Sequence, residues 1–343
     1  MTDGPENYLI ELSGSLPDPS AWDDVIRTSG APVFYLSDVL RAYQAHPLQP
    51  ALGVHYVTAR SAGSGELAAV LPAYLTPAAD PLGIMPALVP GYRPGGRPLL
   101  LSHFWHWYDT HLPARRLTSG LITVMVGALR NLAASADAQA FGLVNVPADA
   151  SWTESLGGCG LTGRLIDARY TLDLRSYGSA DDYVGALPRG PRQEYRRHLR
   201  RALAAEAKIA VEDATPGTLA AVARLCRHSA AKHGNPGWYQ PEQLSAFLSA
   251  AGRHVLLITV RMNGDLVAVS VSFADGPRFH NWAAGSVSPR LLPFSPYLML
   301  LYGSVDAALM GRCQLIEGGR RNDAWKKRLG MRRQPLGGWA AAV

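Results

Sequence analysis

Two cationic segments of the sequence carry side chains suited to holding an anion. The first is EGGRRNDAWKKRLGMRR, residues 317–333, in which the cations surround Trp325. Its basic side chains are Arg320, Arg321, Lys326, Lys327, Arg328, Arg332 and Arg333. Fixed cations bind phosphate or stabilise negative charge that develops on an oxygen atom during a reaction. The alternative interpretation is a solvated basic tail, because charge runs are commonly just exposed.

The second cationic segment is RGPRQEYRRHLRRA, residues 189–202, which predicts a helix. Tyr195, Leu199 and Leu203 recur every four residues and, with Ala202, predict a narrow apolar stripe facing the core. The arginines that flank this stripe, and that we take as phosphate-binding candidates, are Arg192, Arg196, Arg197, Arg200 and Arg201. Rows of like charge at this spacing favour a counter-anion, and arginine suits bidentate phosphate contacts. The alternative is a solvated face paired with carboxylates.

A third stretch, LSHFWHWYDTH, covers residues 101–111 and combines histidines with aromatic rings. Its spacing does not match a recognised metal-binding pattern, and we predict no metal site. An aromatic-lined substrate pocket is one interpretation and ordinary packing is the other. The aromatic candidates for substrate contact are Phe104, Trp105 and Tyr108, with Trp282 and Trp325 from the second half.

The charge of the chain is divided unevenly. Residues 1–165 carry 9 Lys+Arg and 13 Asp+Glu, whereas residues 166–343 carry 24 and 14, so the second half is basic. This asymmetry indicates an anionic partner.

No apolar run reaches the length of a membrane span, and no signal peptide is evident, so we expect a cytoplasmic protein. The three cysteines lie far apart and indicate neither disulfides nor zinc.

The predicted elements repeat across the two halves. Helices in residues 22–44 precede a hairpin of residues 54–59 and 67–75, a buried helix over 117–135 and a strand at 141–147. In the second half, helices within 215–252 precede strands around the Asn263-Gly264 turn. A helix at 296–310 and a strand ending at Glu317 follow. The fold class is therefore α/β (α+β), with two tandem domains of mixed central sheets flanked by helices.

Four stretches resemble a known family: PVFYLSDVLRAYQ before AVLPAYL, then RGPRQEYRRHLRRALAAEAKIAVE, then GDLVAVSVSF, and finally FSPYLMLLYGSVDAALMG with LIEGGRRNDAWKKRLG. They are similar to tandem acyltransferases of the Gcn5-related N-acetyltransferase (GNAT) superfamily, in particular the Fem-like group, which uses aminoacyl-tRNA. The resemblance implies two GNAT-like domains. Residues 1–165 would lie on the acceptor side, and residues 166–343 would bind the donor tRNA.

The resemblance also implies roles for side chains. Trp325 and Lys326 stand at the aromatic-Lys position of the family, which places Lys326 at the acyl-transfer centre, where a cation stabilises the oxyanion. His280, Glu317 and Asp323 are the local candidates for the general base, although the tRNA ribose or a weakly basic nucleophile would make a protein base unnecessary. Arg320, Arg321 and Lys327 would contact acceptor-stem phosphates.

We therefore expect an enzyme that moves an aminoacyl group from aminoacyl-tRNA to an amine or hydroxylamine of a small acceptor, without a further cofactor. The chain lacks the helical arm of many Fem-like ligases, which favours antibiotic biosynthesis over wall building. Two alternatives stay open. One is an acyl-CoA-dependent N-acyltransferase, which the proline-rich, glycine-poor residues SVSPRLLPFSP disfavour, because prolines lack the N–H donors that cradle a pyrophosphate. The other is a non-catalytic protein that binds RNA or phosphate.

Overall fold

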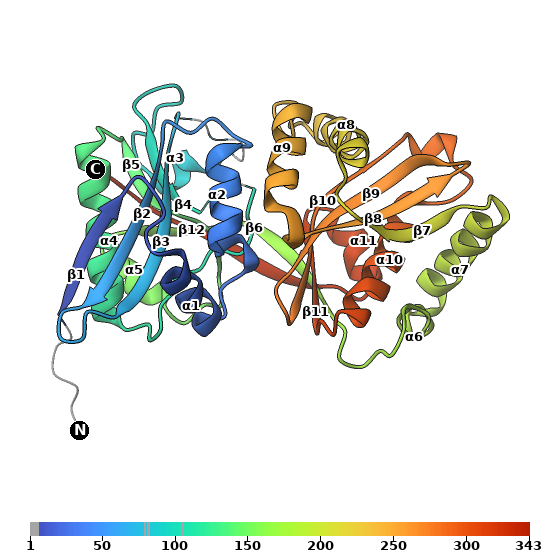
Figure 1. Ribbon diagram of the computed structural model, residues 1–343, viewed down its shortest axis with the longest axis horizontal. Coiled ribbons are helices and arrows are strands. Elements are labelled where there is room, and N and C mark those ends of the chain that lie inside the picture. The colour runs from blue at the N-terminus through green and yellow to red at the C-terminus, as the bar shows by residue number, and fades with distance from the viewer. Residues whose placement is uncertain (1–6, 79, 81–82, 104–105) are drawn as a thin grey trace. The chain divides into compact units, whose positions relative to one another are not determined.

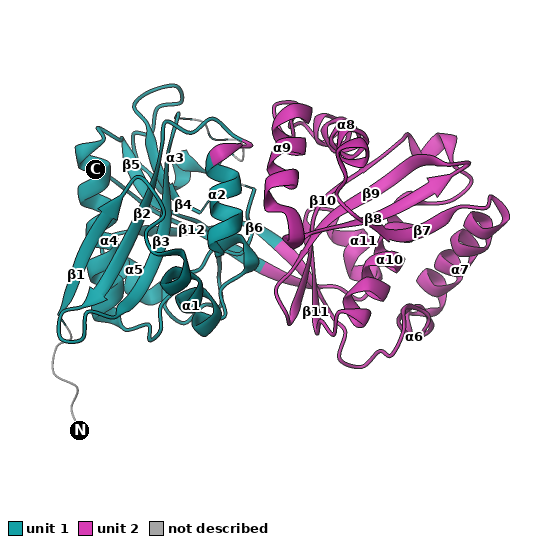
Figure 2. Cartoon of the chain, viewed as in Figure 1, with its two compact units in different colours: residues 1–44, 49–168, 335–343 teal, residues 45–48, 169–334 magenta. Residues whose placement is uncertain are grey.

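The computed structural model divides the chain into two compact units. The residues that it describes are 7–78, 80, 83–103 and 106–343. Unit 1 consists of residues 1–44, 49–168 and 335–343, and unit 2 of residues 45–48 and 169–334 (Figure 2). In each unit helices pack against a mixed sheet (Figure 1).

The sheet of unit 1 contains one parallel pair among antiparallel neighbours. Its strands lie in the order β1 (Tyr8–Ser13), β2 (Gly53–Ser61), β3 (Leu67–Thr76), β4 (Leu99–Ser102), β5 (Ala140–Pro147) and β12 (Arg332–Ala342). Only the pair β4–β5 is parallel among these neighbours. The parallel pair requires a crossover, and the long helix α4 (Ser119–Ser135) provides it.

The sheet of unit 2 repeats this arrangement. Its strands lie in the order β7 (Lys208–Glu212), β8 (Val255–Met262), β9 (Asp265–Ala274), β10 (Arg278–Ser286), β11 (Leu315–Arg320) and β6 (Thr162–Asp173). The pair β10–β11 is parallel and the other neighbours are antiparallel. The crossover between β10 and β11 is α10 (Pro296–Met310). The predicted duplication is therefore present in strand order as well as in sequence.

The two units exchange their last strands. β6 follows the elements of unit 1 in the sequence, but it pairs with β11 of unit 2. β12 follows the elements of unit 2, but it pairs with β5 of unit 1. Residues 335–343, which we expected in the second domain, consequently belong to unit 1, because their main-chain hydrogen bonds go to β5.

The helices of unit 1 cover both faces of its sheet. They are α1 (Pro19–Ser29), the 3-10 turn η1 (Val33–Tyr35), α2 (Ser37–Ala45), α3 (Met85–Leu88), α4 and α5 (Thr153–Gly158). Alternation along β2 separates the two cores, because Tyr56 packs with Trp22 of α1 while Val57 packs with the residues of α4.

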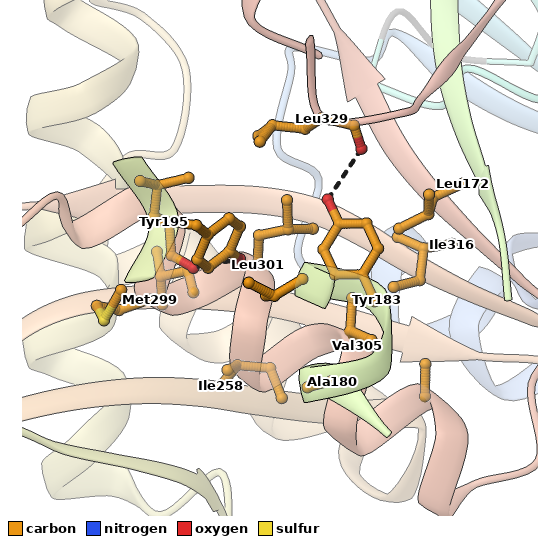
Figure 3. Close-up of a cluster of buried hydrophobic side chains, with 14 of the residues drawn as sticks. Leu172, Ala180, Tyr183, Tyr195, Ile258, Met299, Leu301, Val305, Ile316 and Leu329 are labelled. Atoms are coloured by element: carbon orange, nitrogen blue, oxygen red, sulfur yellow. Dashed lines mark hydrogen bonds between the residues drawn. The ribbon is translucent and has the colours of Figure 1, made fainter. Parts of the chain in front are cut away.

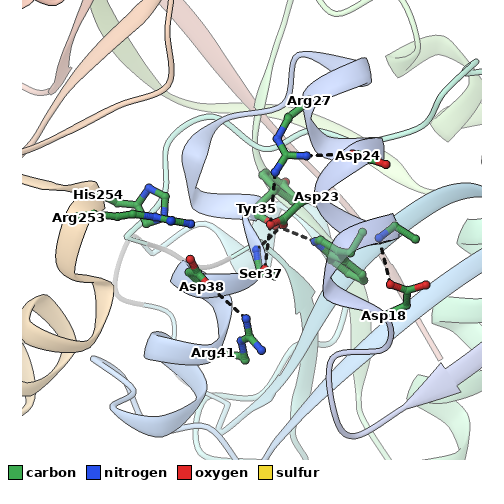
Figure 4. Close-up of polar contacts among 12 residues, drawn as sticks. Asp18, Asp23, Asp24, Arg27, Tyr35, Ser37, Asp38, Arg41, Arg253 and His254 are labelled. Carbon is green, nitrogen blue, oxygen red and sulfur yellow. Dashed lines mark hydrogen bonds and ion pairs between the residues drawn. The ribbon is translucent and has the colours of Figure 1, made fainter.

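Polar contacts fix α1 and α2 at their ends (Figure 4). The carboxylate of Asp18 accepts a hydrogen bond from the Ala21 N–H and caps α1. Trp22 Nε1 donates to the Tyr35 carbonyl at 2.8 Å. Asp23 accepts from both the N–H and the hydroxyl of Ser37, at 2.7 and 3.0 Å, where α2 begins. The first helix thus holds the start of the second.

The core of unit 2 depends on two buried tyrosines (Figure 3). Its helical elements are α6 (Ala180–Ala186), α7 (Arg189–Ala204), α8 (Pro216–Lys232), α9 (Pro241–Ala251), η2 (Gly252–His254), η3 (Pro289–Leu291), α10 and α11 (Asp323–Arg328). Tyr183 of α6 donates to the Leu329 carbonyl at 2.9 Å. Tyr195 of α7 donates to the Leu298 carbonyl, on α10, at 2.7 Å. Both hydroxyls are therefore satisfied inside an apolar cluster.

The apolar stripe predicted for α7 is correct at Tyr195 and Ala202 but wrong at Leu203. Tyr195 and Ala202 are buried and Leu199 is half-buried, whereas Leu203 is 78% exposed. Seven residues turn a helix by a little less than two full turns, so Ala202 lies about 20° from Tyr195. Eight residues place Leu203 about 80° from Tyr195, on the other side of it from Ala202 and beyond the half-buried Leu199. The helix packs along the seven-residue spacing.

Most predicted elements are confirmed and several strands were missed. The structure contains the expected helices of residues 22–44, 117–135 and 296–310, and the hairpins β2–β3 and β8–β9. The sequence reasoning missed β1, β4, β7 and β12, and the residues of α11 were not assigned to a helix. β1 and β7 are edge strands with mixed burial, so their alternation is weak. Residues 317–342 are built into the fold and are not a solvated tail.

The close contact between β5 and β12 leaves no room for a side chain at Gly142. A Cβ atom at Gly142 would lie 2.2 Å from the Trp339 carbonyl oxygen and 2.8 Å from Ala340 Cα. We therefore expect Gly142→Ala to lower the free energy of unfolding by about 3 kcal/mol or more, measured by urea denaturation.

Gly127→Ala is the matched control for this substitution. Gly127 lies within α4 and its Cβ would meet no atom within 4 Å, so alanine should stabilise the protein by up to about 1 kcal/mol. Equal effects of the two substitutions would contradict the proposed close packing of β12 on β5.

Candidate functional site

Pairing between β10 and β11 stops partway along both strands. The ladder joins Arg278, Phe279 and His280 to residues 315–317, although β10 continues to Ser286 and β11 to Arg320. A register shift interrupts β10 between Asn281 and Ala283. Beyond His280 the facing main-chain groups of the two strands do not pair with each other. An extended ligand can hydrogen-bond such edges, which makes this divergence the centre of the candidate site.

One face of the sheet at the divergence holds buried charged groups. His280 is fully buried, and its Nε2 lies 2.8 Å from the carboxylate of Asp275. Arg278 Nε donates to the same carboxylate at 3.0 Å. Burial alone would raise the pKa of Asp275, but the hydrogen bond from His280 and the charges of His280 and Arg278 hold this pKa below its usual value. Asp275 is therefore a carboxylate that orients the imidazole.

Glu317 lies beside His280 on this face, because the two are register partners in the parallel pair. Its carboxylate is buried, and Oε1 lies 3.3 Å from Arg169 Nη1. Arg169 comes from β6, where it is the register partner of Arg320. Strands β10, β11 and β6 thus bring His280 and Arg278, Glu317, and Arg169 to one face of the sheet.

Lys326 lies on the opposite face. Tyr170 of β6 and Ile316 of β11 lie on that side and share a core cluster with Leu329. The Lys326 ammonium is buried, lies 4.9 Å from the centroid of the Tyr170 ring, and donates to the carbonyls of Gly319 and Arg320 at 3.0 and 2.7 Å. It therefore fixes the last two residues of β11, from which the loop to α11 begins.

That loop has an uncommon backbone. Gly319, Arg321 and Asn322 have φ values of 68°, 61° and 58°. Left-handed backbone is unfavourable for residues other than glycine, and surrounding contacts must stabilise it. The two hydrogen bonds from Lys326 supply such contacts, so this side chain has a clear positioning role.

Asp323 is the first residue of α11, and Lys327 follows Lys326 near the end of this helix. The Tyr170 hydroxyl donates to Asp323 Oδ1 at 2.5 Å, and Lys327 Nζ lies 3.0 Å from Asp323 Oδ2. These two contacts lower the pKa of Asp323. The predicted catalytic residues therefore fall into two groups: Lys326 and Asp323 on one face of the sheet, His280 and Glu317 on the other.

The arginines of α7 differ in their contacts. Arg192 Nη1 donates to the Gly185 carbonyl at 2.8 Å and so links α6 to α7. Arg196, Arg197, Arg200 and Arg201 are exposed, and their side chains make no hydrogen bond or ion pair with the described residues. An open hollow on α7 is lined by Gly190, Gln193, Glu194, Arg196, Arg197, Leu199 and Arg200.

The other predicted cations and aromatic side chains of unit 2 differ in how deeply they are buried. Arg321 is exposed and donates to the His233 carbonyl at 3.4 Å, whereas Arg320 is half-buried. Trp325 is half-buried against the core of unit 2. Trp282 is buried in an aromatic cluster, 5.4 to 5.9 Å from the rings of Tyr239, Phe273 and Phe247.

The segment that enters α10 offers few main-chain donors to a phosphate. Residues 287–295 contain prolines and the turn η3, and Pro296 opens the helix. The Ser295 N–H donates to His198 Nδ1 of α7 at 2.9 Å. Burial, together with the charge of Arg197, lowers the pKa of His198 and favours the neutral ring that accepts this bond. One of the few donors at the start of α10 is therefore already used by the protein.

The aromatic and histidine stretch of unit 1 forms a buried cluster. His103 stacks on Tyr74 at 5.5 Å and meets Tyr35 edge-on at 4.7 Å. Tyr108 is buried as well. Phe104 and Trp105, which we proposed as substrate contacts, lie outside the described residues.

Sequence reasoning missed three residues of the site: Asp275, Arg169 and Asn281. Asp275 lies in the turn between β9 and β10, where a carboxylate is typical of a turn, so its type gave no signal. Arg169 became a partner of Glu317 only through the exchanged strand β6. Asn281 follows His280 directly, and only the interrupted pairing distinguishes it.

The described residues provide neither a cluster of metal ligands nor a membrane-spanning helix. Among them, no group of three or more His, Cys, Asp or Glu side chains is placed to hold a metal ion. None of the helices in the same part of the chain combines the length and apolar character needed to cross a membrane.

Residues 189–327 match the acetyltransferase (GNAT) domain family. This segment runs from the start of α7 into α11, so the part of the chain that is similar to GNAT acetyltransferase domains lies within unit 2. No curated protein gives a significant match to the sequence.

Solved structures resemble the chain over nearly its whole length. The crystal structure of FemX has a TM-score of 0.69 and 11% identity, covering 97% of both chains. A tandem GNAT protein from the clavulanic acid biosynthesis pathway has a TM-score of 0.59 and 14% identity over 98% of both. L-PGS from Bacillus licheniformis has a TM-score of 0.60 and 10% identity over 95% of this chain and 92% of that one. The two units with their repeated sheets therefore form a tandem GNAT fold, which confirms the predicted fold class.

The buried imidazole of His103 should make unit 1 sensitive to acid. Burial lowers the pKa of His103 to about 3, against about 6.5 in an unfolded chain. The unfolded state therefore binds the proton first, and stability contributed by the neutral ring is lost as pH falls from about 6.5 towards 3. We expect up to about 1.4 kcal/mol of lost unfolding free energy per pH unit. His103→Phe should remove this component in urea titrations, and an unchanged slope would contradict the assignment.

Proposed function

We propose that this protein is an aminoacyltransferase that moves an aminoacyl group from aminoacyl-tRNA to an amine or hydroxylamine of a small molecule. The GNAT-type domain of unit 2 supports acyl transfer. The interrupted pairing of β10 and β11 provides main-chain edges for an extended acyl donor. The Fem-like resemblance of the sequence motifs supports aminoacyl-tRNA as that donor.

The observation that carries the choice of donor is the exposed arginine surface of α7. Arg196 and Arg200 form one row at a spacing of four residues, and Arg197 and Arg201 form another. Glu194 is the nearest acid in the helix, and its carboxylate lies 2.7 Å from Arg328. Like charges at this spacing repel, so the surface gains stability from an external polyanion. The phosphates of an RNA acceptor stem supply one, with charge repeated along the chain.

The proposed reaction forms an amide and breaks an ester. The amine nitrogen bonds to the carbonyl carbon, the ester C–O bond breaks, and the ribose oxygen leaves. The amine gives up a proton that the leaving ribose oxygen takes. In this proposal His280, oriented by Asp275, relays that proton, and Lys326 fixes the loop of residues 319–322 at the end of β11.

An acyl-CoA donor is the second candidate, because the matching family is described as acetyltransferase. The segment before α10 argues against it. Its prolines lack N–H groups, and the Ser295 N–H is bonded to His198. A protein that binds RNA without catalysis is the third candidate, since the α7 surface alone would account for RNA binding.

The decisive experiment offers the purified protein a charged tRNA pool together with small amines and hydroxylamines. We expect one amino acid to leave the pool and appear as an amide, and ribonuclease treatment to abolish this transfer. Transfer from acyl-CoA that resists ribonuclease would establish the second candidate. RNA binding without transfer from either donor would establish the third.

The α7 surface should determine RNA affinity. Arg196→Gln with Arg200→Gln should weaken tRNA binding on the order of tenfold or more and reduce the slope of log K against log salt by about 1 to 2. Fluorescence anisotropy over a series of salt concentrations measures both quantities.

The control for these substitutions is Arg224→Gln with Arg227→Gln, which removes the same charge from two exposed positions of α8. It should leave the affinity and the salt slope close to those of the unchanged protein. Equal losses in the two double variants would mean that net charge, and not the α7 surface, attracts the RNA.

Lys326 and Lys208 form a matched pair for testing the acyl-transfer centre. Lys326→Met removes the two hydrogen bonds that hold the loop of residues 319–322, and we expect kcat to fall on the order of 100-fold. Lys208→Met removes the same charge from an exposed position at the start of β7, and its effect should stay within about threefold. Transfer assays with circular dichroism as a folding check decide the matter, and equal effects would count against a role for Lys326.

A further inference from the structure

We propose that His198 is a phosphate ligand of the α7 surface: its Nε2–H donates to a phosphate oxygen of the bound donor, while its Nδ1 stays bonded to the main chain at the start of α10. The inference begins with one hydrogen bond. The Ser295 N–H donates to His198 Nδ1 at 2.9 Å. A main-chain N–H can only donate, so Nδ1 is the acceptor and carries no proton.

The same bond decides which nitrogen of the ring carries the proton. A neutral imidazole has one N–H, and with Nδ1 as the acceptor this hydrogen is on Nε2. The two nitrogens point to different sides of a rigid ring, so Nε2–H is directed away from Ser295. Nε2 makes no hydrogen bond with the described residues and is not shielded from solvent. His198 therefore presents a donor in a fixed orientation to a ligand.

His198 lies at the border between the packed side and the cationic side of α7. Residues three and four apart are neighbours on a helix surface. On one side His198 adjoins Tyr195 and Ala202, which are buried. On the other side it adjoins Glu194 and Arg201, and the Arg201 side chain is exposed. The imidazole is itself half-buried, so one edge of it packs while the other faces the arginines.

The charges around the ring favour its neutral form. Burial and the charge of Arg197 lower the pKa of His198, Arg201 adds to this effect, and Glu194 opposes it. The carboxylate of Glu194 also lies 2.7 Å from Arg328 Nη2. A neutral N–H beside two arginines offers an anion a directed hydrogen bond together with the attraction of fixed positive charge.

This inference rests on the proposed binding of a phosphate-bearing donor to α7. A phosphate group accepts several hydrogen bonds at once, so it can take the Nε2–H of His198 together with a guanidinium of the row formed by Arg197 and Arg201. Ser295 is the N-cap of α10, the helix that crosses from β10 to β11. The ring thus joins the bound phosphate to the helix beside the diverging strands and makes His198 a positioning residue for the donor.

The test separates the two nitrogens with His198→Asn and His198→Gln. The asparagine amide oxygen takes the place of Nδ1 and accepts from Ser295, but nothing replaces Nε2. The glutamine amide nitrogen takes the place of Nε2 and donates, but the acceptor for Ser295 is lost. We expect His198→Asn to weaken binding of uncharged tRNA about five- to twentyfold and to leave hydrogen exchange of the Ser295 amide unchanged. His198→Gln should keep the affinity within about threefold and speed that exchange on the order of tenfold.

The salt dependence of tRNA binding tests the charge of the ring. Its slope follows the number of protein cations at phosphates, so loss of a neutral donor in His198→Asn should change the slope of log K against log salt by less than about 0.3. A slope reduced by about 1 would mean that the ring binds as an imidazolium, and it would overturn the proposed neutral donor.

The matched control is His228→Asn, which makes the same change at an exposed position of α8 and should leave the tRNA affinity unchanged. A folded His198→Asn variant that binds tRNA as tightly as the unchanged protein overturns the proposal. A purely structural histidine gives the reverse ranking, because His198→Gln then loses the affinity together with the Ser295 bond. The unchanged protein gives a further check: bound tRNA should leave the Ser295 amide protected, and faster exchange in the complex also overturns the proposal.

The donor and the role of His198 fail separately, because coenzyme A carries phosphates of its own and serves as the second probe. If the unchanged protein transfers only from acyl-CoA, aminoacyl-tRNA is wrong as donor, and the same ranking of the two variants, measured with coenzyme A, still supports His198. If the unchanged protein binds neither tRNA nor coenzyme A, both proposals are overturned.

Discussion

The end of main-chain pairing between β10 and β11 is the constraint on which the candidate site depends. Hydrogen bonds hold the strands together as far as His280 and Glu317 and no further. Up to that point alternation sends His280 and Glu317 to one face and Phe279 and Ile316 to the other. Beyond it, the bulge in β10 and the left-handed loop after β11 carry the groups that can meet a ligand. Charged side chains thus collect where the regular sheet ends.

A second constraint governs the arginines of α7. Tyr195 bonds to the Leu298 carbonyl and His198 accepts the Ser295 N–H, so the helix is tied twice to the start of α10. These contacts use one side of α7 and leave the rows that begin with Arg196 and Arg197 exposed. The same bond at Ser295 removes a main-chain donor from the entrance to α10. One packing arrangement therefore favours binding of phosphates along α7 and disfavours it at the helix start.

Much of this fold follows from local patterns, whereas the site does not. The apolar run of residues 117–135 and the Asn263-Gly264 turn predict their elements, because periodicity and turn chemistry are local. The predicted set Lys326, His280, Glu317 and Asp323 is close in sequence or in register. It is nevertheless divided between two faces, because the helix that carries Lys326 and Asp323 packs against Tyr170 on the face opposite His280 and Glu317. The prediction of an apolar stripe on α7 was wrong at Leu203, because each step of four residues turns about 40° past a full turn of the helix. The ion pair between Arg169 and Glu317 depends on the pairing of β6 with β11, and no local sequence pattern predicts that pairing.

The exchange of β6 and β12 has a consequence for the order in which the molecule is made. The main-chain groups at the open edge of β5 find their partners only in residues 335–343, which the ribosome adds after every element of unit 2. Unit 1 is therefore the first unit begun and the last completed. Until then an unpaired strand edge stays open to other chains. The order of synthesis thus couples the maturation of one unit to the synthesis of the other.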